Sequence, residues 1–308
     1  MFILLKEESL MTKPLFIWAG GKNKMLKHYK PKFEKESFGG IKTPISIESY
    51  VEPFFGGGAM FIYVMQNYKP KNAYINDINQ EIVSVYECIK HNYKEFLDRV
   101  IELEEQYLPL SFKKDTRNED RRKFYNDLRL SYWDKEQYNK WSKPYGAATL
   151  YFLMKTGFNG IFQTNKGNGR YGTPCGLLNQ KDKVFDRTIV KWWHDILQNV
   201  HITCGDWKEN TPYIKNAFYF FDPPYRDSFA DYGNSFGDDK LIELIDFADD
   251  KDKVFVCNRD SADGWFEKHK KSLNIEKYDI TYTAGRRKKT DNGFEAKKAQ
   301  EVLLWRMN

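Results

Sequence analysis

The chain has 308 residues, 41% of them hydrophobic, which is enough to bury a real core and more than one compact domain usually needs. Lysine and arginine exceed aspartate and glutamate by 49 to 43, and the net charge of +6 is compatible with a polyanionic partner without proving one. No apolar run approaches a membrane span, and acidic residues close behind the short apolar start exclude a secretory signal peptide. We therefore expect a cytoplasmic protein with a main domain and an inserted or appended one.

The cysteines and histidines are scattered along the chain. No CxxC pair occurs, and the five histidines show no metal-ligand spacing near the four cysteines. We therefore expect no metal site. We also expect buried, reduced thiols at Cys88, Cys175, Cys204 and Cys257.

The first predicted elements alternate between strand and helix. A short strand ends at Glu52, a glycine turn covers 56–58, and a helix begins at Ala59 and ends near Gln66. A second strand ends at Asp77. The helix after it places four apolar residues on one face, namely Ile82, Val85, Tyr86 and Ile89. This order implies a parallel sheet with right-handed crossovers.

Strand signals stop between about residues 93 and 193, where the sequence is mostly helical or loop-like. They return in five later segments, 200–206, 217–222, 253–258, 275–285 and 299–308. An amphipathic helix is expected at 238–250, and a basic loop joins the last two strands. An interruption of about a hundred residues is longer than a structureless loop. We therefore expect an α/β domain formed by residues 1–95 and 196–308, with an inserted, largely helical domain at 96–195.

Several unusual features lie where predicted strands end, which is where open α/β sheets bind ligands. Glycines after Glu52 would let the backbone approach a ligand, although a tight turn without a ligand explains them equally well. Asp77 could accept hydrogen bonds from ribose hydroxyls or cap the helix that follows. In "FIWAGGK", Trp18 and Lys22 flank a glycine turn. A lone tryptophan is usually part of the core and a lone lysine is usually solvated. Together at one rim, however, the indole and the ammonium group could bind S-adenosylmethionine, which carries a cationic centre and a carboxylate.

The stretch "YFFDPPYRD", residues 219–227, places a carboxylate, two prolines and an aromatic ring directly after a predicted buried strand. Pro223 and Pro224 have fixed φ and no N–H, so they hold the carbonyl groups of the bend in set directions. Asp222 and the Pro223 carbonyl could then accept the two N–H bonds of a base amine and stabilise the positive charge that develops as it attacks a methyl group. Tyr225 could stack on the extruded base. The alternative is a strand ended by prolines with a capping aspartate.

Taken in order, "FIWAGGK", "VEPFFGGGAMF", "INDIN" and "FFDPPY" resemble the Dam-type DNA adenine N6-methyltransferases, the alpha-class amino methyltransferases. The segment "TLYFLMKTGFNGIFQTNKGNGRYGTPCG" is similar to that family as well, so the resemblance extends from Pro14 to Trp305. It implies a Rossmann-like S-adenosylmethionine-dependent methyltransferase fold with a mixed, mostly parallel sheet. It also implies methyl transfer to N6 of adenine in double-stranded DNA by base flipping, without a metal. A cognate restriction endonuclease is a partner that the resemblance allows.

The resemblance also implies roles for individual residues around the cofactor. Trp18, Lys22 and Asp77 would contact S-adenosylmethionine, and Asp222 would close the site beside its methyl group. Glu52 and the turn from Gly56 to Gly58 would lie near the methionine end. Asp206 and Trp207 occupy the position at which related enzymes hold the adenine of the cofactor.

The inserted domain would recognise the DNA target. The candidate base-reading residues are Asn159, Gln163, Asn165, Lys166 and Arg170. Gln163 stands where the enterobacterial enzymes carry an arginine that reads guanine, and glutamine suits adenine, so recognition of GATC is in doubt.

Two basic segments are candidate phosphate contacts. Arg286, Arg287 and Lys288 lie in the late basic loop and could hold the backbone near the flipped nucleotide, or could belong to a solubilising hairpin tip. The segment 112–124 carries six basic and three acidic residues, as either a phosphate contact or a solvated helix face.

Other functions stay open at this point. The same acceptor geometry would suit N4 of cytosine or an RNA substrate, and a relative without catalysis would bind DNA alone. Neither the recognition sequence nor the oligomeric state can be read from the sequence.

Overall fold

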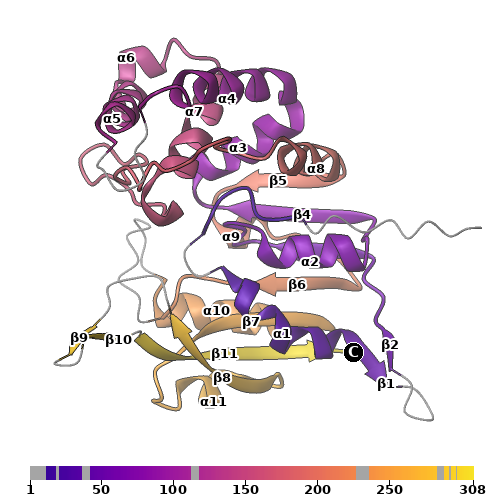
Figure 1. Ribbon diagram of the computed structural model, residues 1–308. Helices are drawn as coiled ribbons and strands as arrows, with labels where there is room; N and C mark the ends of the chain where they lie inside the picture. Colours follow the sequence, from indigo (N-terminus) through magenta and orange to yellow (C-terminus); the bar gives the residue numbers. More distant parts are fainter. Residues whose placement is uncertain are drawn as a thin grey trace, which may run out of the picture.

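A seven-stranded sheet forms the centre of the computed structural model, which describes residues 12–18, 21–36, 42–111, 118–226, 236–282, 288–290, 293–295 and 297–308 (Figure 1). The strand order is β5-β4-β3-β6-β7-β11-β8. The strands are β3 (Ser49–Glu52), β4 (Asn72–Asp77), β5 (Val200–Cys204), β6 (Ala217–Phe221), β7 (Lys253–Asp260), β8 (Asn274–Tyr282) and β11 (Lys297–Met307). The pairs from β5 to β7 are parallel, whereas β11 is antiparallel to both β7 and β8. This confirms the predicted mixed, mostly parallel sheet.

Two short antiparallel pairs lie outside this sheet. They are β1 (Glu34–Glu36) with β2 (Lys42–Pro44), and β9 (Lys288–Thr290) with β10 (Gly293–Glu295). The second pair falls within the predicted basic loop, so that loop contains a hairpin of its own.

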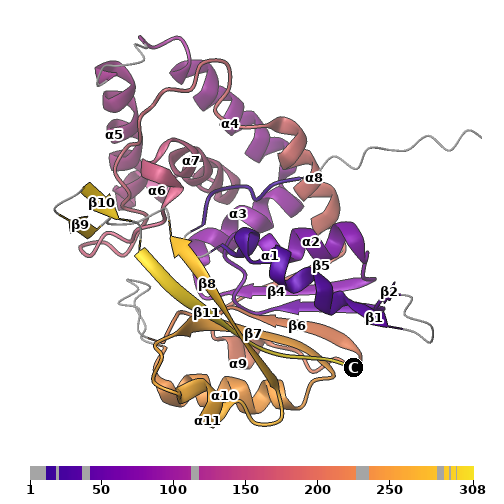
Figure 2. The ribbon, with the colours of Figure 1, turned by 60° about the horizontal axis from the view of Figure 1, so that its bottom comes forward.

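Helices cover both faces of the sheet, as Figure 2 shows with α1 and α2 above it and α10 and α11 below. Those near the sheet are η1 (Lys22–Lys24), α1 (Leu26–Tyr29), η2 (Lys30–Phe33), α2 (Ala59–Asn67), α3 (Gln80–His91), α8 (Arg187–Leu197), α9 (Trp207–Asn210), α10 (Asp238–Asp249) and α11 (Trp265–His269). Strand β6 shows why both faces are covered. Its side chains alternate between two buried clusters, with Phe218 and Phe220 in one and Tyr219 and Phe221 in the other.

The interval between β4 and β5 is largely helical. It contains α4 (Tyr93–Tyr107), α5 (Glu119–Trp133), α6 (Lys135–Tyr138), α7 (Lys143–Thr156) and η3 (Phe158–Gly160), in addition to α3 and α8. Helix α7 is buried nearly all round because α3, α4 and α5 pack against it. None of the helices in the described ranges is long and apolar enough to cross a membrane.

The expectation of four buried thiols is wrong for one cysteine, and one arginine of the basic segment fits neither role expected for that segment. Cys88, Cys175 and Cys257 are buried, but Cys204 is exposed because it ends β5 at the edge of the sheet. Arg121, in the basic segment 112–124, is neither on a solvated face nor placed for a phosphate contact.

Arg121 is buried, with an exposed fraction of 1%, and its guanidinium group ties α5 to neighbouring backbone. It donates hydrogen bonds to four carbonyl groups, those of Leu108, Leu110, Leu178 and Gln180. The first two follow α4 and the last two follow the turn-dense segment. The side chain therefore joins three parts of the helical interval.

We predict that Arg121→Ala lowers the free energy of unfolding by about 3 to 5 kcal/mol, because several buried carbonyl groups lose their donor. Urea denaturation followed by far-UV circular dichroism would measure the change. Lys123→Ala is the matched control on the same helix, since Lys123 forms an exposed pair with Asp127 and its loss should change the free energy of unfolding far less. Equal effects of the two substitutions would contradict the structural role of Arg121.

Candidate active site

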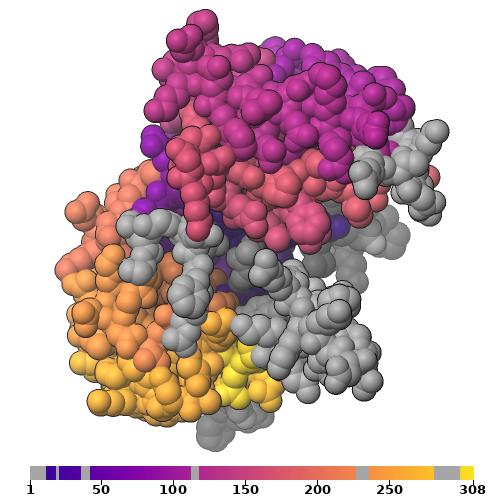
Figure 3. Space-filling view, turned by 90° about the vertical axis from the view of Figure 1, so that its left-hand side faces the viewer, coloured from indigo at the N-terminus to yellow at the C-terminus, as the bar shows by residue number. Residues whose placement is uncertain are grey.

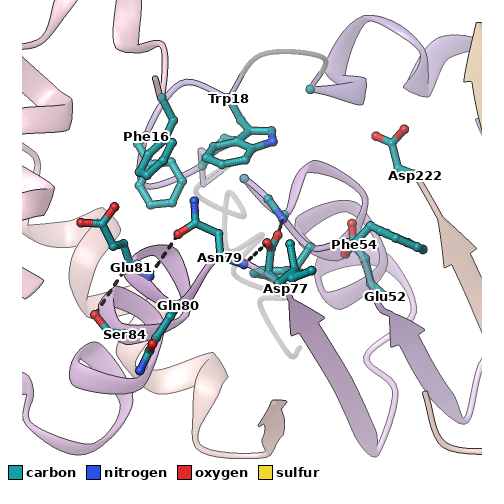
Figure 4. Close-up of a pocket in the computed structure, with 18 of the residues that line it drawn as sticks. Phe16, Trp18, Glu52, Phe54, Asp77, Asn79, Gln80, Glu81, Ser84 and Asp222 are labelled. Atoms are coloured by element: carbon teal, nitrogen blue, oxygen red, sulfur yellow. Dashed lines mark hydrogen bonds between the residues drawn. The ribbon is translucent and has the colours of Figure 1, made fainter. Parts of the chain in front are cut away.

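Four acidic residues follow four adjacent strands at one edge of the sheet. Glu52 and Asp77 are the last residues of β3 and β4, while Asp222 directly follows β6 and Asp206 lies just after β5. Because these strands are parallel neighbours, their carboxyl ends meet at the same edge. Figure 4 shows Glu52, Asp77 and Asp222 arranged in this way. All four acids line one cavity of about 1960 Å³.

Figure 3 faces this edge of the sheet, with the helical interval above and the part around β7 and β11 below. The cavity lining includes Tyr138 and Arg170 of the helical interval as well as Pro223 and Tyr225, which follow β6. The arrangement offers room for more than one ligand.

The Asp-Pro-Pro-Tyr corner ends β6 and turns into the cavity. Strand β6 pairs with β3 up to Tyr219 and with β7 up to Phe221, and the two prolines then end the ladder because they lack N–H groups. The corner is tied to β7 through Asn258, whose Oδ1 accepts a hydrogen bond of 3.0 Å from the Arg226 backbone N–H. Asp222, Pro223, Pro224 and Tyr225 all line the cavity, so the structure brings the four predicted catalytic residues together.

Lys22 joins the N-terminal glycine turn to this corner. Its Nζ donates to Asp222 Oδ1 at 2.6 Å and to the Tyr225 hydroxyl at 3.1 Å. The lysine side chain is only 3% exposed and that of Asp222 20%. Burial alone would lower the pKa of Lys22, but the carboxylates of Asp222 and Glu301 outweigh it and hold the pKa above its usual value. Lys22 is therefore a buried ammonium group.

Asp222 differs from an ordinary ion-paired aspartate. Burial raises its pKa to about 6, and the attraction of Lys22 only partly offsets that effect. The nearby carboxylate of Glu301 raises the pKa further. Near neutral pH the group is ionised and can accept hydrogen bonds at the cavity wall.

The glycine turn and Asp77 support each other. Asp77 Oδ2 accepts a hydrogen bond of 2.8 Å from the Gly56 N–H, and its Oδ1 accepts one of 2.9 Å from the Asn79 N–H. Gly56 and Gly58 have positive φ angles, and a Cβ on Gly56 would lie 2.5 Å from Trp18 Nε1. The indole of Trp18 therefore lies directly against a turn that only glycine allows.

Asp77 does not cap the helix that follows it. The N-cap of α3 is Asn79, whose side chain accepts hydrogen bonds from the N–H groups of Glu81 and Ile82. Burial raises the pKa of Asp77, opposed by the backbone hydrogen bonds that it accepts. The helix-capping alternative for Asp77 is thus wrong.

The remaining predicted cofactor residues also line the cavity. Glu52 is buried beneath it and accepts a hydrogen bond of 2.8 Å from the Tyr50 hydroxyl, and burial raises its pKa well above the usual range. Asp206 is the N-cap of α9, since its side chain accepts from the Lys208 N–H at 2.9 Å. Trp207, the first residue of α9, packs between Phe54 and the sheet.

The turn-dense segment contains the expected hairpin. Thr164 and Tyr171 form an antiparallel bridge, and the Asn165 N–H donates to the Arg170 carbonyl at 2.7 Å. Gln163 and Lys166 are exposed, so their side chains are accessible to a bound DNA molecule. Asn159 is exposed too, in a left-handed conformation. Base reading by these residues stays a prediction.

Arg170 differs from the other hairpin residues because its guanidinium group is bound within the chain. It donates to the Tyr132 carbonyl and lies 3.7 Å from the ring centroid of Tyr138. Beside it, Glu81 accepts hydrogen bonds from the Tyr132 hydroxyl and, at 3.0 Å, from the Tyr171 N–H. These contacts fix the base of the hairpin against α3 and α5, and contact between Arg170 and DNA stays a prediction.

Some predicted contacts lie outside the described residues. These are Arg286, Arg287 and the part of the basic segment at 112–117, and of Lys288 only the backbone is described, as the first residue of β9.

Sequence reasoning missed two acids that support the site, Glu301 and Glu81. Glu301 directly precedes the apolar run 302–305 of β11, and an acid at that position is a signal that could have marked it. Glu81 carries no such signal, because an acid in the first turn of a helix is common.

Comparison with known proteins identifies the family. Over residues 18–283 the chain matches the family described as D12 class N6 adenine-specific DNA methyltransferase. It is 32% identical to the type II methyltransferase M.MjaIII of Methanocaldococcus jannaschii, with 86% of this chain and 90% of that protein covered. It is 27% identical to the type II methyltransferase M1.LlaDCHI of Lactococcus lactis subsp. cremoris, with 92% and 93% covered.

The chain is also 25% identical to the DNA adenine methylase of Escherichia coli strain K12, with 89% of this chain and 91% of that protein covered. Since the family match covers most of its length, the chain belongs to the D12 class N6 adenine-specific DNA methyltransferases. It is an enzyme that methylates N6 of adenine in DNA at specific sites. This confirms the family and the activity that the motifs predicted.

We predict that activity is lost as the pH falls through about 6, because protonation of Asp222 removes a hydrogen-bond acceptor from the corner. The pKa is raised, so the loss should begin well above the range of an ordinary aspartate. Single-turnover methylation rates at saturating DNA and cofactor, measured from pH 5 to 8, would show about a tenfold fall per pH unit below the pKa. A rate that stays constant down to about pH 5 would contradict the assignment.

Proposed function

We propose that the enzyme takes its methyl group from S-adenosylmethionine bound at the edge formed by β3, β4 and β5. When bound, this cofactor supplies an electrophilic methyl group on a sulfonium centre. The residues present fit it, because carboxylates suit its hydroxyl and ammonium groups and the turn at Gly56 brings backbone and indole close together. Each oxygen of Asp77 accepts one backbone N–H and has a second lone pair with which to accept a ribose hydroxyl.

The remaining assignments at the cofactor site follow the positions of the side chains. Glu52 would face the methionine amine, Trp18 would pack on the ligand, and Asp206 with Trp207 would lie beside its adenine. For Lys22 we propose a role beside the predicted contact with the cofactor. Because its Nζ donates to Asp222 and Tyr225, we propose that it acts on the reaction by orienting these two side chains.

The corner at Asp222 is the proposed place for the target adenine, flipped out of double-stranded DNA. The Asp222 carboxylate and the Pro223 carbonyl would accept the two hydrogens of the N6 amine and stabilise the positive charge that develops on it. Tyr225 would stack on the base. The observation that carries this proposal is that the buried carboxylate lines the same cavity as Trp18, Glu52 and Asp77.

Recognition of the target is proposed for the hairpin above the cavity. Gln163, Asn165 and Lys166 would contact base edges or phosphates, with Asn159 beside them, and Arg286, Arg287 and Lys288 would contact the backbone. In this arrangement residues 96–195 act as the target-recognition domain and residues 1–95 and 196–308 as the catalytic domain. Arg170 would support the hairpin from within.

We also propose a cognate restriction endonuclease as a functional partner. The relatives M.MjaIII and M1.LlaDCHI carry the name type II methyltransferase, at 32% and 27% identity, whereas the DNA adenine methylase of Escherichia coli is 25% identical. The DNA substrate favours the cytoplasm as the place of action.

The direct test is to incubate the purified chain with unmethylated DNA and S-adenosylmethionine, and to digest the DNA to nucleosides. We expect N6-methyladenine alone. N4-methylcytosine alone, or DNA binding without any methylated nucleoside, would overturn the proposal. Long-read modification mapping of the same DNA would identify the recognition sequence.

We predict that Asp222→Asn lowers the single-turnover methylation rate by about 10² to 10³-fold while the dissociation constants for DNA and cofactor change little. The amide has nearly the same shape but lacks the charge that stabilises the developing cation. Asp195→Ala is the control, since Asp195 forms an exposed pair with Lys191 on α8. An equal loss of DNA binding or of thermal stability would indicate a structural role instead.

We predict that Asp77→Ala acts chiefly on the cofactor, raising its dissociation constant by about 10- to 100-fold because hydroxyl acceptors and the support of the Gly56 turn are lost. Isothermal titration with S-adenosylhomocysteine would measure this change. Asp98→Ala, which breaks an exposed pair with Lys94, is the control. A normal dissociation constant would count against the ribose assignment.

A further inference from the structure

Glu301 is a buried acid in a strand that is otherwise apolar at its centre. It lies in β11 opposite Arg259 of β7 and Tyr278 of β8, and only 1% of its surface is exposed. Leu303, on the same face of β11, belongs to the buried core that includes Tyr29 and Phe33, and Trp305 packs against that core. Burying a carboxylate is costly unless it is hydrogen-bonded or paired, so its position needs a physical reason.

The reason lies in the contacts of the carboxylate. The Tyr225 hydroxyl donates a hydrogen bond of 2.6 Å to Glu301 Oε1, and the same hydroxyl oxygen accepts one of 3.1 Å from Lys22. Lys22 in turn donates to Asp222. The four side chains thus form one chain of charge-assisted hydrogen bonds, which leads from the reactive corner into the sheet.

These contacts hold the ring of Tyr225 at both ends. Its backbone is fixed by the two prolines before it, and its hydroxyl is fixed by an acceptor and a donor from two other elements. A tyrosine ring rotates about two side-chain torsions, and without the acceptor at its tip only packing and the longer hydrogen bond from Lys22 would restrict them.

We propose that Glu301 is a positioning residue of the methyl-transfer reaction, which holds the Tyr225 ring in the orientation that receives the flipped adenine. The inference rests on the stacking role proposed for Tyr225 above. Glu301 does not itself reach the substrate, since it is buried behind the ring. It acts through the hydroxyl, and a displacement of the ring by about 1 Å would be enough to slow the reaction by about 10²-fold.

The charge of Glu301 has a second effect, on Asp222. Burial raises the pKa of Asp222 and Lys22 lowers it, and the like charge of Glu301 adds a smaller upward effect. Removing the charge should therefore lower that pKa and move the acid limb of the rate profile to lower pH. The titratable groups that interact with Asp222 come from several elements and are Lys22 of η1, Tyr29 of α1, Tyr50 and Glu52 of β3, Cys257 of β7 and Glu301 of β11.

A double-mutant cycle between Glu301 and Tyr225 tests the proposal. We expect Glu301→Ala and Tyr225→Phe each to lower the single-turnover methylation rate by about 10- to 100-fold, with dissociation constants for DNA and cofactor within about twofold of the wild type. Combined, they should cost no more than the larger single loss, because both remove the same contact. A combined loss equal to the product of the two would overturn the proposal.

The charge effect has its own readout in Glu301→Gln, which keeps an acceptor oxygen for the Tyr225 hydroxyl. We expect its acid limb at lower pH than that of the wild type, and a rate near neutral pH within about threefold. An unmoved or upward-shifted limb would contradict this charge effect. If Glu301→Ala does not fold, the rate of Glu301→Gln near neutral pH tests the positioning role instead, and a fall as large as that caused by Tyr225→Phe would contradict it.

The matched control is Gln300→Ala. Gln300 is the neighbouring residue of β11 and its side chain donates to Asp279, away from Tyr225. It should change neither the rate nor the pH profile. Failure of the inference can be told from failure of the proposed function. If only the inference fails, the wild-type enzyme still methylates adenine and Asp222→Asn still loses activity. If the proposed function fails, neither of these two results is obtained.

Discussion

The buried ion pair of Lys22 and Asp222 is the contact on which the active site depends. It joins a turn near the N-terminus to the end of β6, two segments that are 200 residues apart in sequence. In a poorly hydrated site such a pair is strong, and removing one partner leaves a buried charge uncompensated. Its burial is tolerable because Tyr225 and Glu301 extend it into a hydrogen-bonded network. The position of the Asp-Pro-Pro-Tyr corner is therefore set by contacts with parts of the chain that are distant in sequence.

The topology of the sheet explains how these groups meet. Parallel strands β4, β3 and β6 deliver Asp77, Glu52 and Asp222 at their carboxyl ends. Strand β11 runs in the opposite direction, so its first half lies at the same edge and brings Glu301 there. The antiparallel strand β11 thus adds a buried acid, Glu301, to an edge that otherwise receives acids only from the carboxyl ends of parallel strands.

Much of this arrangement was predictable from sequence, and the rest was not for physical reasons. The strands β3, β4 and β6 were predictable because each is an apolar run that stops at an acid. The same pattern placed Glu52, Asp77 and Asp222 at one edge of the sheet. Sequence could not show that β11 lies between β7 and β8, because strand pairing is a long-range property. It also could not distinguish the buried guanidinium group of Arg121, or that of Arg170 on its tyrosines, from arginines that face DNA, since their partners are carbonyl groups and rings far along the chain.

The most direct measurement is a crystal structure of the enzyme with a cofactor analogue and a DNA duplex that contains its recognition sequence. The account predicts an adenine rotated out of the helix, with N6 within hydrogen-bonding distance of the Asp222 carboxylate and the Pro223 carbonyl. Its ring should lie on Tyr225, and the analogue should contact Asp77. An adenine bound elsewhere in the cavity, or an analogue away from the ends of β3 and β4, would contradict it.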